Sequence, residues 1–401
     1  MKHNFSIMLS QTSLFFQYLL VFYFTIQVAY LLFFSIAGRV VPVKKYPRAK
    51  VLRRIRIFIP ACKEDAVIIA TAKDAIRQDY PSDLYEVVII ADSFSEITLA
   101  ALRLLPLKIV EVNFQKSTKG KALQKAIEFT AHDPVDIAVI LDADNHMAPG
   151  FLHAVNDAFE QGFEVVQGHR IAKNFQTSFA FLDACIEEIN NHFFRRGHVA
   201  VGLPAALIGS AMAFDWNLFV SILQDIGETS GEDREFEFRL LRQRKNIAFL
   251  DGSFVYDEKV ANSEVFSNQR SRWLAIQVEF LQKNFIEGWL QLYKGNGPFF
   301  NKLVQTFLFP RILLILSLCI WLCWVCFFST HFVWYSLVLL LALFISLLIA
   351  IPIRLFNKKL LVALFHLPLA LISMLNALLK MPKARKQFIH TPHIESEINL
   401  N

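Results

Sequence analysis

Apolar residues gather at the two ends of the chain, whereas the middle alternates short apolar runs with polar segments. No residue from Asn4 to Gly38 carries a formal charge, and Leu14–Ala37 is long enough to cross the ~30 Å hydrocarbon core of a bilayer as a helix. A cleavable signal peptide is the alternative, but no small-x-small cleavage site ends this long run. We therefore expect residues 1–40 to form a retained N-terminal transmembrane helix.

A second apolar region covers residues 312–353, where 42 consecutive positions carry no formal charge. One crossing needs ~20 residues, so the region is long enough for two helices, and Ser-Thr-His at 329–331 supplies a polar turn near its middle. We expect a transmembrane hairpin within residues 293–380. A last apolar run, Leu360–Leu379, either spans the membrane or lies in its interface. Three residues interrupt this run: His366, Pro368 and Asn376.

Positive charges predict the orientation of the chain in the membrane. Only Lys2 precedes the first span, whereas several cations follow it closely: Arg39, Lys44, Lys45, Arg48, Lys50, Arg53, Arg54 and Arg56. Because cytoplasmic flanks carry the excess of Lys and Arg, we expect the central domain in the cytosol. Cations also flank both ends of the last apolar run, which favours an interfacial segment over a spanning one and predicts a cytosolic tail, residues 381–401.

Between the membrane segments, short β-branched runs alternate with helical patterns. The expected strands are Ile55–Ile59, Val87–Ile90, Lys108–Val112, Ile137–Leu141, Glu164–Gln167 and Ile247–Leu250. The expected helices are Asp65–Gln78, Lys121–Thr130 and Phe151–Gln161. Such alternation is typical of an α/β sheet with helices on its faces. No Gly/Ser linker divides the stretch, so we expect one cytosolic domain, residues 41–292, with interfacial helices at its end.

The composition agrees with a membrane-anchored protein, because 54% of the residues are hydrophobic and only 19% are charged. The net charge of +6 is accounted for by the cations that flank the apolar segments, so we expect no nucleic-acid partner. Cys323 and Cys326 have the spacing of a metal-binding pair, but they lie inside a predicted membrane helix without a second pair of ligands. We interpret them as packed or lipid-facing thiols.

Two carboxylates follow a buried-type strand at Asp142-Ala143-Asp144. Ligands of α/β sheets gather at the carboxyl ends of strands, which is where these side chains are expected. Hard cations such as Mg²⁺ or Mn²⁺ take oxygen ligands and bridge carboxylates to a substrate diphosphate. The alternative is a turn in which the side chains only cap the next helix or hydrogen-bond the loop.

Polar residues also follow the first two strands. Glu64 comes after the first strand and Asp92 after the second, and acidic groups in such places accept hydrogen bonds from a base or a ribose. Helix-start charges and caps explain them equally well. Lys121 belongs to a Lys-Gly-Lys segment that opens a helix, where backbone N–H groups and ammonium groups face a phosphate in many proteins.

Two further groups lie closer to the second membrane region. Glu232 and Asp233 begin a predicted helix, and Asp233 is a candidate to take a proton from a hydroxyl nucleophile; complementation of the helix dipole is the alternative. Gln269, Arg272 and Trp273 combine a guanidinium suited to a diphosphate with an aromatic plane suited to a sugar. A basic interfacial helix is the other interpretation of this segment.

The order of these motifs carries more information than any one of them. Along the chain stand Pro-Ala-x-x-Glu, Ala-Asp-Ser, Lys-Gly-Lys-Ala-Leu, Asp-Ala-Asp, Gly-Ser-Ala-Met-Ala-Phe, Gly-Glu-Asp and Gln-x-x-Arg-Trp, followed by the hairpin. Together they resemble the membrane-bound family 2 glycosyltransferases of the hyaluronan, chitin, cellulose and poly-N-acetylglucosamine synthase type. The segment Phe388–Pro392 is similar to the closing Trp-x-Arg-Thr segment of that family.

The resemblance implies a GT-A (Rossmann-like) α/β fold, an inverting mechanism and a nucleoside-diphosphate sugar donor such as a UDP-sugar. Asp92 would contact the nucleotide, Asp142 the donor, and Asp144 the metal ion, Mg²⁺ or Mn²⁺. The expected donor-binding residues are Glu64, Asp92, Lys121, Asp142, Gln269, Arg272 and Trp273.

For the acceptor side, the resemblance implies Asp233 as the catalytic base, next to Glu232, and an acceptor pocket formed by Gly209, Ser210 and Trp273. The base would deprotonate an acceptor hydroxyl that attacks the anomeric carbon. The metal and an arginine would take up charge on the departing diphosphate. The acceptor would be a saccharide or a lipid-linked group, because the Gln-x-x-Arg-Trp motif also occurs in relatives that add a single sugar to a lipid.

A second hypothesis is a non-catalytic membrane scaffold or polysaccharide export partner that retains the fold. Loss of a key carboxylate would mark such a protein. The carboxylates are all present, at Asp142, Asp144, Glu232 and Asp233. The enzyme is therefore the leading hypothesis.

Overall fold

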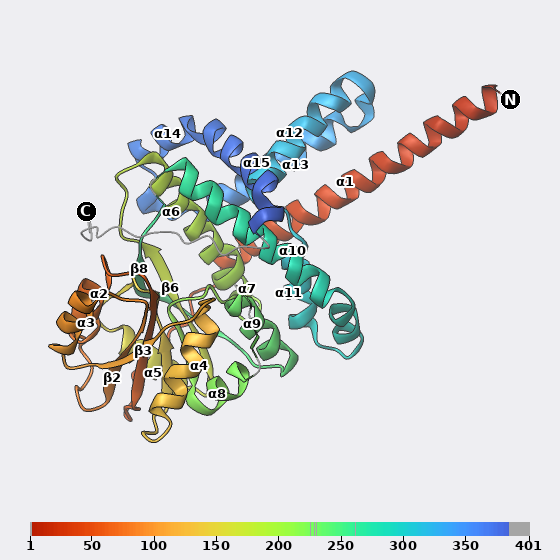
Figure 1. Ribbon diagram of the computed structural model, residues 1–401. Helices are drawn as coiled ribbons and strands as arrows, with labels where there is room; N and C mark the ends of the chain where they lie inside the picture. The colour runs from red at the N-terminus through yellow and green to blue at the C-terminus, as the bar shows by residue number, and fades with distance from the viewer. Residues whose placement is uncertain (1, 225, 228, 230, 261, 385–401) are drawn as a thin grey trace.

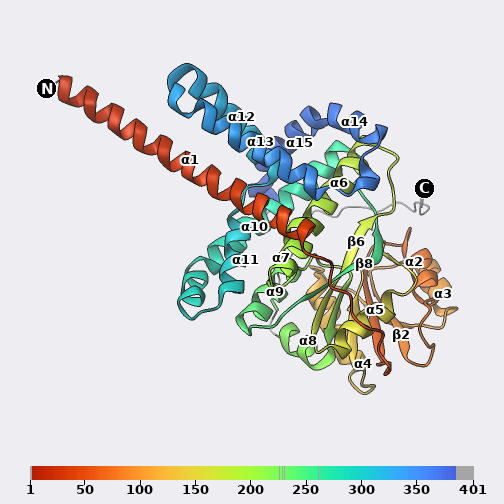
Figure 2. The same cartoon turned by 180° about the vertical axis from the view of Figure 1, so that it is seen from behind.

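The computed structural model describes residues 2–224, 226–227, 229, 231–260 and 262–384, and it shows an α/β domain joined to a group of long apolar helices (Figure 1). Helix α1 (Lys2–Val40) extends away from the domain on the side of the hairpin formed by α12 (Arg311–Phe328) and α13 (Val333–Ala350). Figure 2 shows the same arrangement from behind. The Phe388–Pro392 segment and most of the predicted tail lie outside the described residues.

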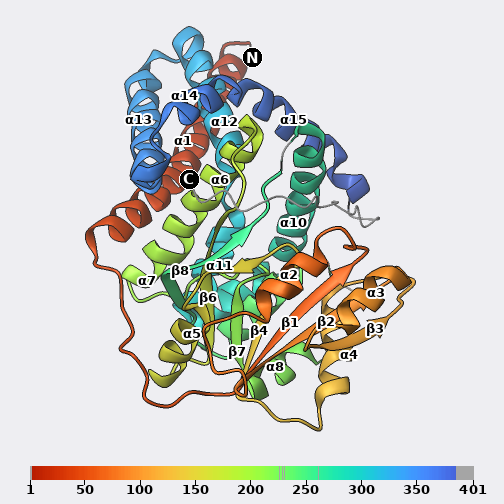
Figure 3. The same ribbon diagram turned by 90° about the vertical axis from the view of Figure 1, so that its left-hand side faces the viewer.

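A mixed sheet of eight strands forms the centre of the domain, in the order β3-β2-β1-β4-β7-β6-β8-β5 (Figure 3). The strands are β1 (Ile55–Cys62), β2 (Tyr85–Asp92), β3 (Lys108–Val112), β4 (Ile137–Ile140), β5 (His146–Met147), β6 (Val165–Ala172), β7 (Met212–Asp215) and β8 (Ala248–Asp257). β3, β2, β1 and β4 run parallel, so their carboxyl ends meet at one edge of the sheet. β7 is antiparallel to both β4 and β6, and β6 is again parallel to β8.

Helices cover both faces of the sheet. Ile57 and Ile59 of β1 belong to one buried cluster, whereas Phe58 between them belongs to the cluster on the opposite face, because successive residues of a strand point to opposite sides. The first cluster includes α2 (Ile68–Ala75) and α5 (Phe151–Glu160). The second includes α4 (Lys119–Thr130), α8 (Trp216–Leu223) and α9 (Glu232–Arg242). The fully buried run of β1 therefore fills two cores.

The remaining elements of the domain connect it to the apolar helices. They are α3 (Glu96–Arg103), α6 (Ser178–Asn191), the π-helical turn η1 (His192–Arg196), α7 (Gly197–Ala200), α10 (Ser263–Tyr293) and α11 (Gly297–Phe307). α10 and α11 pack on α9 through a cluster in which Phe238, Phe280 and Phe299 are buried. The segment expected to begin the membrane hairpin thus starts with a helix that is packed against the domain, and the hairpin itself begins at Arg311.

Three helices in the described part of the chain are long and apolar enough to cross a membrane: Thr12–Val40, Arg311–Phe328 and Thr330–Ala350. Polar contacts join α1 to the hairpin at both ends. Gln17 accepts a hydrogen bond from Ser329 near the hairpin turn (2.8 Å), and Arg39 donates to the backbone oxygen of Ile349 near the domain (2.6 Å). α1 and α13 therefore run in the same direction, and the chain N-terminus lies on the side of the hairpin turn (Figure 1).

The last apolar run forms two helices, α14 (Lys358–Phe365) and α15 (Leu367–Ala384), bent by 52° at His366. The two short 3-10 turns on either side of α13 are η2 (Thr330–Phe332) and η3 (Ile353–Leu355). α15 packs along α10, where Lys380 donates a hydrogen bond to Asn268 (2.9 Å). The pair becomes a fourth span only if both helices are taken as one broken crossing.

The predicted α/β fold is confirmed, and each of the expected strands lies within or largely overlaps an observed one. The expected helix Asp65–Gln78 is shorter, since α2 begins at Ile68 without a side-chain cap. Asp65 Oδ1 instead accepts hydrogen bonds from Ser95 N–H (3.0 Å) and the Thr98 hydroxyl (2.6 Å), so its carboxylate binds the start of α3. The short strands β5 and β7 have no apolar run long enough to predict them.

Candidate active site

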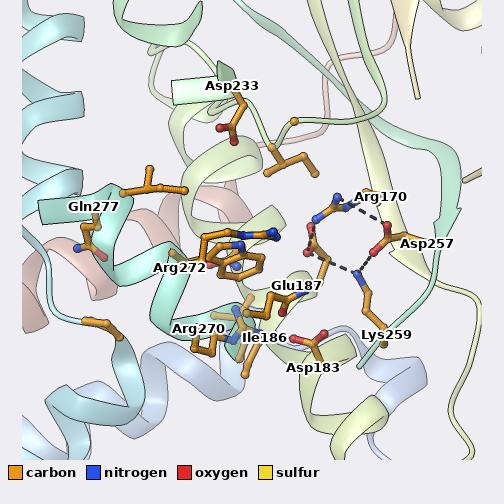
Figure 4. A pocket seen from close by; sticks show the side chains of 18 of the residues that line it. Arg170, Asp183, Ile186, Glu187, Asp233, Asp257, Lys259, Arg270, Arg272 and Gln277 are labelled. Atoms are coloured by element: carbon orange, nitrogen blue, oxygen red, sulfur yellow. Dashed lines mark hydrogen bonds and ion pairs between the residues drawn. The ribbon is translucent and has the colours of Figure 1, made fainter. Parts of the chain in front are cut away.

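The carboxyl ends of the parallel strands border a cavity of about 770 Å³ that continues toward the apolar helices. Small-molecule sites commonly have ~300–1,000 Å³, so this volume suits a ligand of that class. Residues at the ends of β1, β2, β4 and β8 line the cavity, together with α6, α10 and the first turns of α9 and α12. Figure 4 shows side chains around it.

Asp92 is the buried carboxylate at the end of β2, where it pairs in register with Cys62 of β1. Its Oδ1 accepts a hydrogen bond from the Ser93 hydroxyl (2.8 Å), whereas the buried Oδ2 has no hydrogen-bond partner among the described residues. A buried oxygen without a donor is costly, so a hydrogen-bond donor at this place would stabilise it. Glu64, after β1, is also buried and lines the same cavity.

Asp142, after β4, is held by two cations. The Lys119 ammonium contacts both Asp142 Oδ1 and the backbone oxygen of Gly209, each at 2.5 Å. Arg170 Nη1 lies 3.7 Å from Asp142 Oδ2. Lys121 is not among the residues that line the cavity, whereas Lys119 is. Of the two lysines in the Lys-Gly-Lys segment, Lys119 is therefore the one that reaches the cavity.

Asp144 is more deeply buried than Asp142 and is fixed by its neighbours. Its Oδ1 accepts a hydrogen bond from Asn145 Nδ2 (3.2 Å), and its Oδ2 accepts one from the backbone N–H of Glu258 after β8 (2.8 Å). The Ser210 hydroxyl donates to Asn145 Oδ1 and is fully buried, without lining the cavity. Ser210 thus supports the aspartate loop from behind, while Gly209 lines the cavity.

The two aspartates after β4 fit a divalent cation as part of its coordination shell. In the described part of the chain, no three His, Cys, Asp or Glu residues form a group that could hold a metal on their own. Mg²⁺ is commonly bound by one or two carboxylates plus substrate phosphates rather than by an all-protein cage. Asp142 and Asp144 match that partial set, and the phosphate oxygens of a donor would supply the rest.

Glu232 and Asp233 form the first turn of α9 and line the cavity beside the Gly209 loop. Gly209 has a φ of 83°, and a Cβ at this position would lie 3.8 Å from Asp233 Oδ2. The loop expected to hold an acceptor therefore runs directly beside this carboxylate. Burial raises the pKa of Glu232 to about 7; the charge of Lys119 opposes the shift and that of Asp233 adds to it.

Gln269, Arg272 and Trp273 line the cavity from α10. The residue between them, Arg270, holds this part of the helix, because it pairs with Asp183 of α6 and its guanidinium lies 4.1 Å from the centre of the Trp273 ring. This stacking orients the Trp273 plane. The sequence did not predict that Arg270, inside the motif, would support Trp273 in this way.

Arg272 lies close to the carboxylates of the site. Burial lowers the pKa of its guanidinium, and three carboxylates oppose that shift: Glu232, Asp142 and Asp233. Figure 4 shows Arg272 between Asp233 on one side and Glu187 on the other. Arg272 therefore places a buried positive charge beside these carboxylates.

A buried ionic network that the sequence did not predict forms one wall of the cavity (Figure 4). Arg170 of β6 donates to Glu187 of α6 (3.2 Å) and lies 3.7 Å from Asp257. Lys259 lies 2.5 Å from Asp257 and 3.6 Å from Glu187. Burial alone would raise the pKa of Glu187, but the charges of Arg170 and Lys259 hold it well below the ordinary value. The two cations therefore favour the charged form of Glu187.

Little in the sequence pointed to this network. Asp257 ends β8 and Lys259 follows it, but the expected strand ended at Leu250, so the strand-end rule did not reach either residue. Arg170 and Glu187 lie inside a strand and a helix, where a charged residue has no local feature that distinguishes it from a surface position. Only the packing of α6 against β6 brings those two together.

Comparison with known proteins identifies the family of the chain. Residues 53–275 match the model of the glycosyltransferase-like family 2. The chain belongs to this family. The matched region begins before β1 and ends in α10 just after Trp273, so it contains all of the lining residues from the sheet and the Gln-x-x-Arg-Trp motif.

Members of the family with curated names match part of the chain. The β-monoglucosyldiacylglycerol synthase of Trichormus variabilis is 27% identical over 227 residues, which cover 55% of this chain and 48% of that protein. The probable glycosyltransferase YdaM of Bacillus subtilis is 26% identical over 241 residues, covering 56% of this chain and 55% of that protein. The chain thus spans about half the length of the curated relatives it matches.

A solved structure is similar over nearly the whole chain. The mannosyltransferase PcManGT from Pyrobaculum calidifontis, in complex with GDP-Man and Mn²⁺, has a TM-score of 0.55 and 16% identity, and the match covers 89% of this chain and 96% of that chain. At this identity the similarity concerns the fold. It confirms the GT-A fold predicted for the catalytic domain, combined with apolar helices.

Proposed function

We propose that the protein is an inverting glycosyltransferase that moves a sugar from a nucleoside-diphosphate sugar, such as a UDP-sugar, to a saccharide or lipid-linked acceptor. The observation that carries this proposal is the arrangement of three carboxylates in one cavity. Asp142 and Asp144 lie at the end of β4, and Asp233 faces the same space beside Gly209. A carboxylate that can act as a base, on the same cavity as two carboxylates that can hold a metal ion for the diphosphate, suits a single displacement.

In this proposal, Asp233 takes the proton of the acceptor hydroxyl, and the hydroxyl oxygen forms a bond to the anomeric carbon as the bond to the diphosphate breaks. Arg272 and Lys119 stabilise the charge on the departing diphosphate, and Asp92 holds the nucleotide. Bound at Asp144, with Asp142 nearby, Mg²⁺ or Mn²⁺ would supply further positive charge at the diphosphate. The ionic network around Arg170 forms the wall next to these groups.

We further propose that the reaction takes place at the cytosolic face of the cell membrane, in the synthesis of a cell-surface polysaccharide or a glycolipid. The cations that follow α1 and the hairpin support this orientation. The relatives named for a glucosyldiacylglycerol product support a lipid acceptor, and the synthase-like order of motifs supports a saccharide. The alternative is a non-catalytic scaffold or export partner. Loss of a key carboxylate would support it, but Asp142, Asp144, Glu232 and Asp233 are all present.

Replacement of the base tests the proposal. Membranes that contain the full chain are incubated with a panel of radiolabelled UDP- and GDP-sugars and Mn²⁺ or Mg²⁺, and label in product is counted. Asp233→Asn should lower transfer by roughly 10²–10⁴-fold, the usual contribution of a general base. Binding of the donor should be retained, because Asp233 does not contact it in the proposal.

Glu235→Gln is the matched control, because Glu235 is a carboxylate on the same helix that does not line the cavity and pairs with Arg239 and Lys283. It should retain transfer. EDTA should abolish transfer by the unchanged protein, and added Mn²⁺ or Mg²⁺ should restore it. Full activity of Asp233→Asn would remove Asp233 from the base role, and failure to bind any nucleotide sugar with either metal would refute the proposed function.

A further inference from the structure

The cavity does not end at the catalytic carboxylates but continues between the apolar helices. α6 lines it with polar side chains, Asp183, Glu187 and Asn190, and with apolar ones, among them Phe179 at the start of the helix. On α12, Arg311 is followed one turn later by the apolar Ile315. Residues of α13, α14 and α15 complete the apolar part. The cavity therefore has a polar end and an apolar end.

The apolar end opens at the surface of the helices that are expected in the membrane. Phe344 and Leu348 of α13 and Leu364 of α14 line the cavity, and they are also 49%, 54% and 48% exposed. A side chain that both lines a cavity and is exposed marks its mouth. Because α13 is long and apolar enough to span, this mouth faces hydrocarbon, and an apolar chain can enter sideways from the bilayer.

Two arginines in the cavity lining contact the C-terminal end of α6. Arg195, in the π-helical turn η1, is 2% exposed and donates to Asn191 Oδ1 (2.8 Å) and to the backbone oxygen of Ala206 (3.0 Å). Arg311, at the start of α12, donates to Asn190 Oδ1 (2.7 Å). Both line the cavity, and neither forms an ion pair with a carboxylate in the described part of the chain.

These two cations differ from their neighbours in the same cavity. Arg170, Lys259 and Arg270 each have a carboxylate partner. Burial lowers the pKa of Arg195 to about 10 even though the charges of Glu187, Glu237 and Asp233 oppose the shift, so the buried charge remains costly. An anionic group would offset that cost, and the guanidinium fork suits phosphate oxygens in particular.

We propose that the acceptor of this enzyme is a lipid with a phosphate-bearing headgroup. Its apolar chain lies along α6, α12 and α13, and its phosphate faces Arg195 and Arg311, which leaves the hydroxyl that takes the sugar near Asp233. That this lipid accepts a sugar rests on the proposed function. That the cavity binds such a lipid does not depend on it. It narrows the acceptor to an anionic lipid, in contrast to a neutral diacylglycerol.

Lipid binding without any donor tests this site separately from transfer. The full chain in a neutral detergent is titrated with phosphatidic acid or with diacylglycerol of the same acyl chains, and bound lipid is counted by native mass spectrometry. Phosphatidic acid should bind about tenfold or more tightly than diacylglycerol, the usual value of a charge-assisted hydrogen bond. Inorganic phosphate at the same concentration should not displace it, because the apolar chain contributes much of the affinity.

Arg311→Gln should remove most of the difference between the two lipids, and Arg311→Lys should keep part of it. Arg195→Gln should also reduce the difference in affinity between the two lipids. The test can therefore be made even if one of these variants does not fold. Lys359→Gln is the control, because Lys359 is an exposed cation on α14 that does not line the cavity. Equal affinity for the two lipids, displacement by inorganic phosphate alone, or an equal loss in Lys359→Gln overturns the proposal. If phosphatidic acid binds as expected but no sugar is transferred, the proposed function fails and the binding site stands.

Discussion

The two carboxylates that begin α9 lie side by side, and burial acts strongly on one of them. Glu232 has a pKa raised to about 7, because its ionised form is poorly solvated and lies beside Asp233. From the ordinary value of 4.5 up to about 7, the folded protein binds more protons than the unfolded chain. Protonated Glu232 therefore contributes stability that is complete below pH 4.5 and is lost as the pH rises through about 7.

Glu232→Gln should separate this effect from the rest of the protein. The amide keeps the shape of the protonated acid but does not ionise, so its advantage over glutamate should grow with pH. We expect the apparent Tm of the variant in detergent to approach that of the unchanged protein at pH 5 and to exceed it at pH 8. A constant difference in Tm across this range would show that Glu232 does not titrate between these pH values.

Single residues also show how far local sequence information reached. Asp92, Asp142, Asp144 and Asp233 stand out in the sequence because they follow strands or begin a helix, and the structure places all of them on one cavity. Local sequence information did not predict which of two neighbouring residues in a motif faces the cavity. The structure puts Lys119 in the lining and leaves out Lys121 and Ser210, because helix phase and loop direction decide which of two adjacent side chains faces inward.

At the scale of elements, α1 approaches the domain closely through glycine. A Cβ on Gly197 of α7 would lie 2.4 Å from the backbone oxygen of Phe34 in α1, and a Cβ on Gly38 would lie 3.2 Å from the Gly197 Cα. His192 of η1 also contacts the backbone oxygen of Ser35 (2.8 Å). Small residues at a crossing let two helices meet at their backbones. This contact couples the anchor helix to the turn that carries Arg195.

Gly197→Ala should separate the two helices. The added methyl group meets backbone atoms that cannot turn aside, and overpacking of this kind costs about 1–3 kcal/mol, more than the helix propensity of alanine returns. We expect a lower apparent Tm. Gly297→Ala is the comparison, since a Cβ on Gly297 at the start of α11 meets nothing within 4 Å. Equal effects of the two substitutions would mean that the crossing is not tightly packed.

At the scale of the whole molecule, the long helices and the domain form a polarised arrangement. The hairpin turn and the N-terminal half of α1 lie at one end, joined by the Gln17–Ser329 contact, and the sheet lies at the other (Figure 1). The cavity lies where the domain meets the long helices. Its polar end lies in the domain, and its apolar end is lined by the domain-side ends of α12 and α13; in the proposed reaction, a donor in water and an acceptor in lipid would meet at Asp233.

Accessibility of single cysteines tests the orientation. In a variant with all five cysteines replaced by serine, Thr330→Cys places a thiol at the hairpin turn and Glu128→Cys places one on the exposed side of α4. In intact cells, a membrane-impermeant maleimide should label position 330, and position 128 should react only after the cells are opened. The reverse pattern would put the domain outside the cytosol.

The sequence by itself determined the features that depend on local composition and spacing. The apolar ends, the strands Ile55–Cys62 and Ile137–Ile140 and the carboxylates that follow strands are all set by runs of residues near each other in the chain. Hydrophobic burial favours the same local conformation wherever such a run occurs. The family could be recognised for the same reason, because its motifs are short and ordered.

Only the tertiary structure decided which distant residues share the cavity. The pairs Arg170–Glu187 and Arg270–Asp183 join different elements, and Arg195 of η1 and Arg311 of α12 line one cavity. Such contacts depend on how helices pack against each other. The periodicity or composition of a single segment does not predict that packing. The continuity of the cavity from the carboxylates to the membrane-type helices belongs to this second group, because it exists only when α6, α10, α12 and α13 are assembled together.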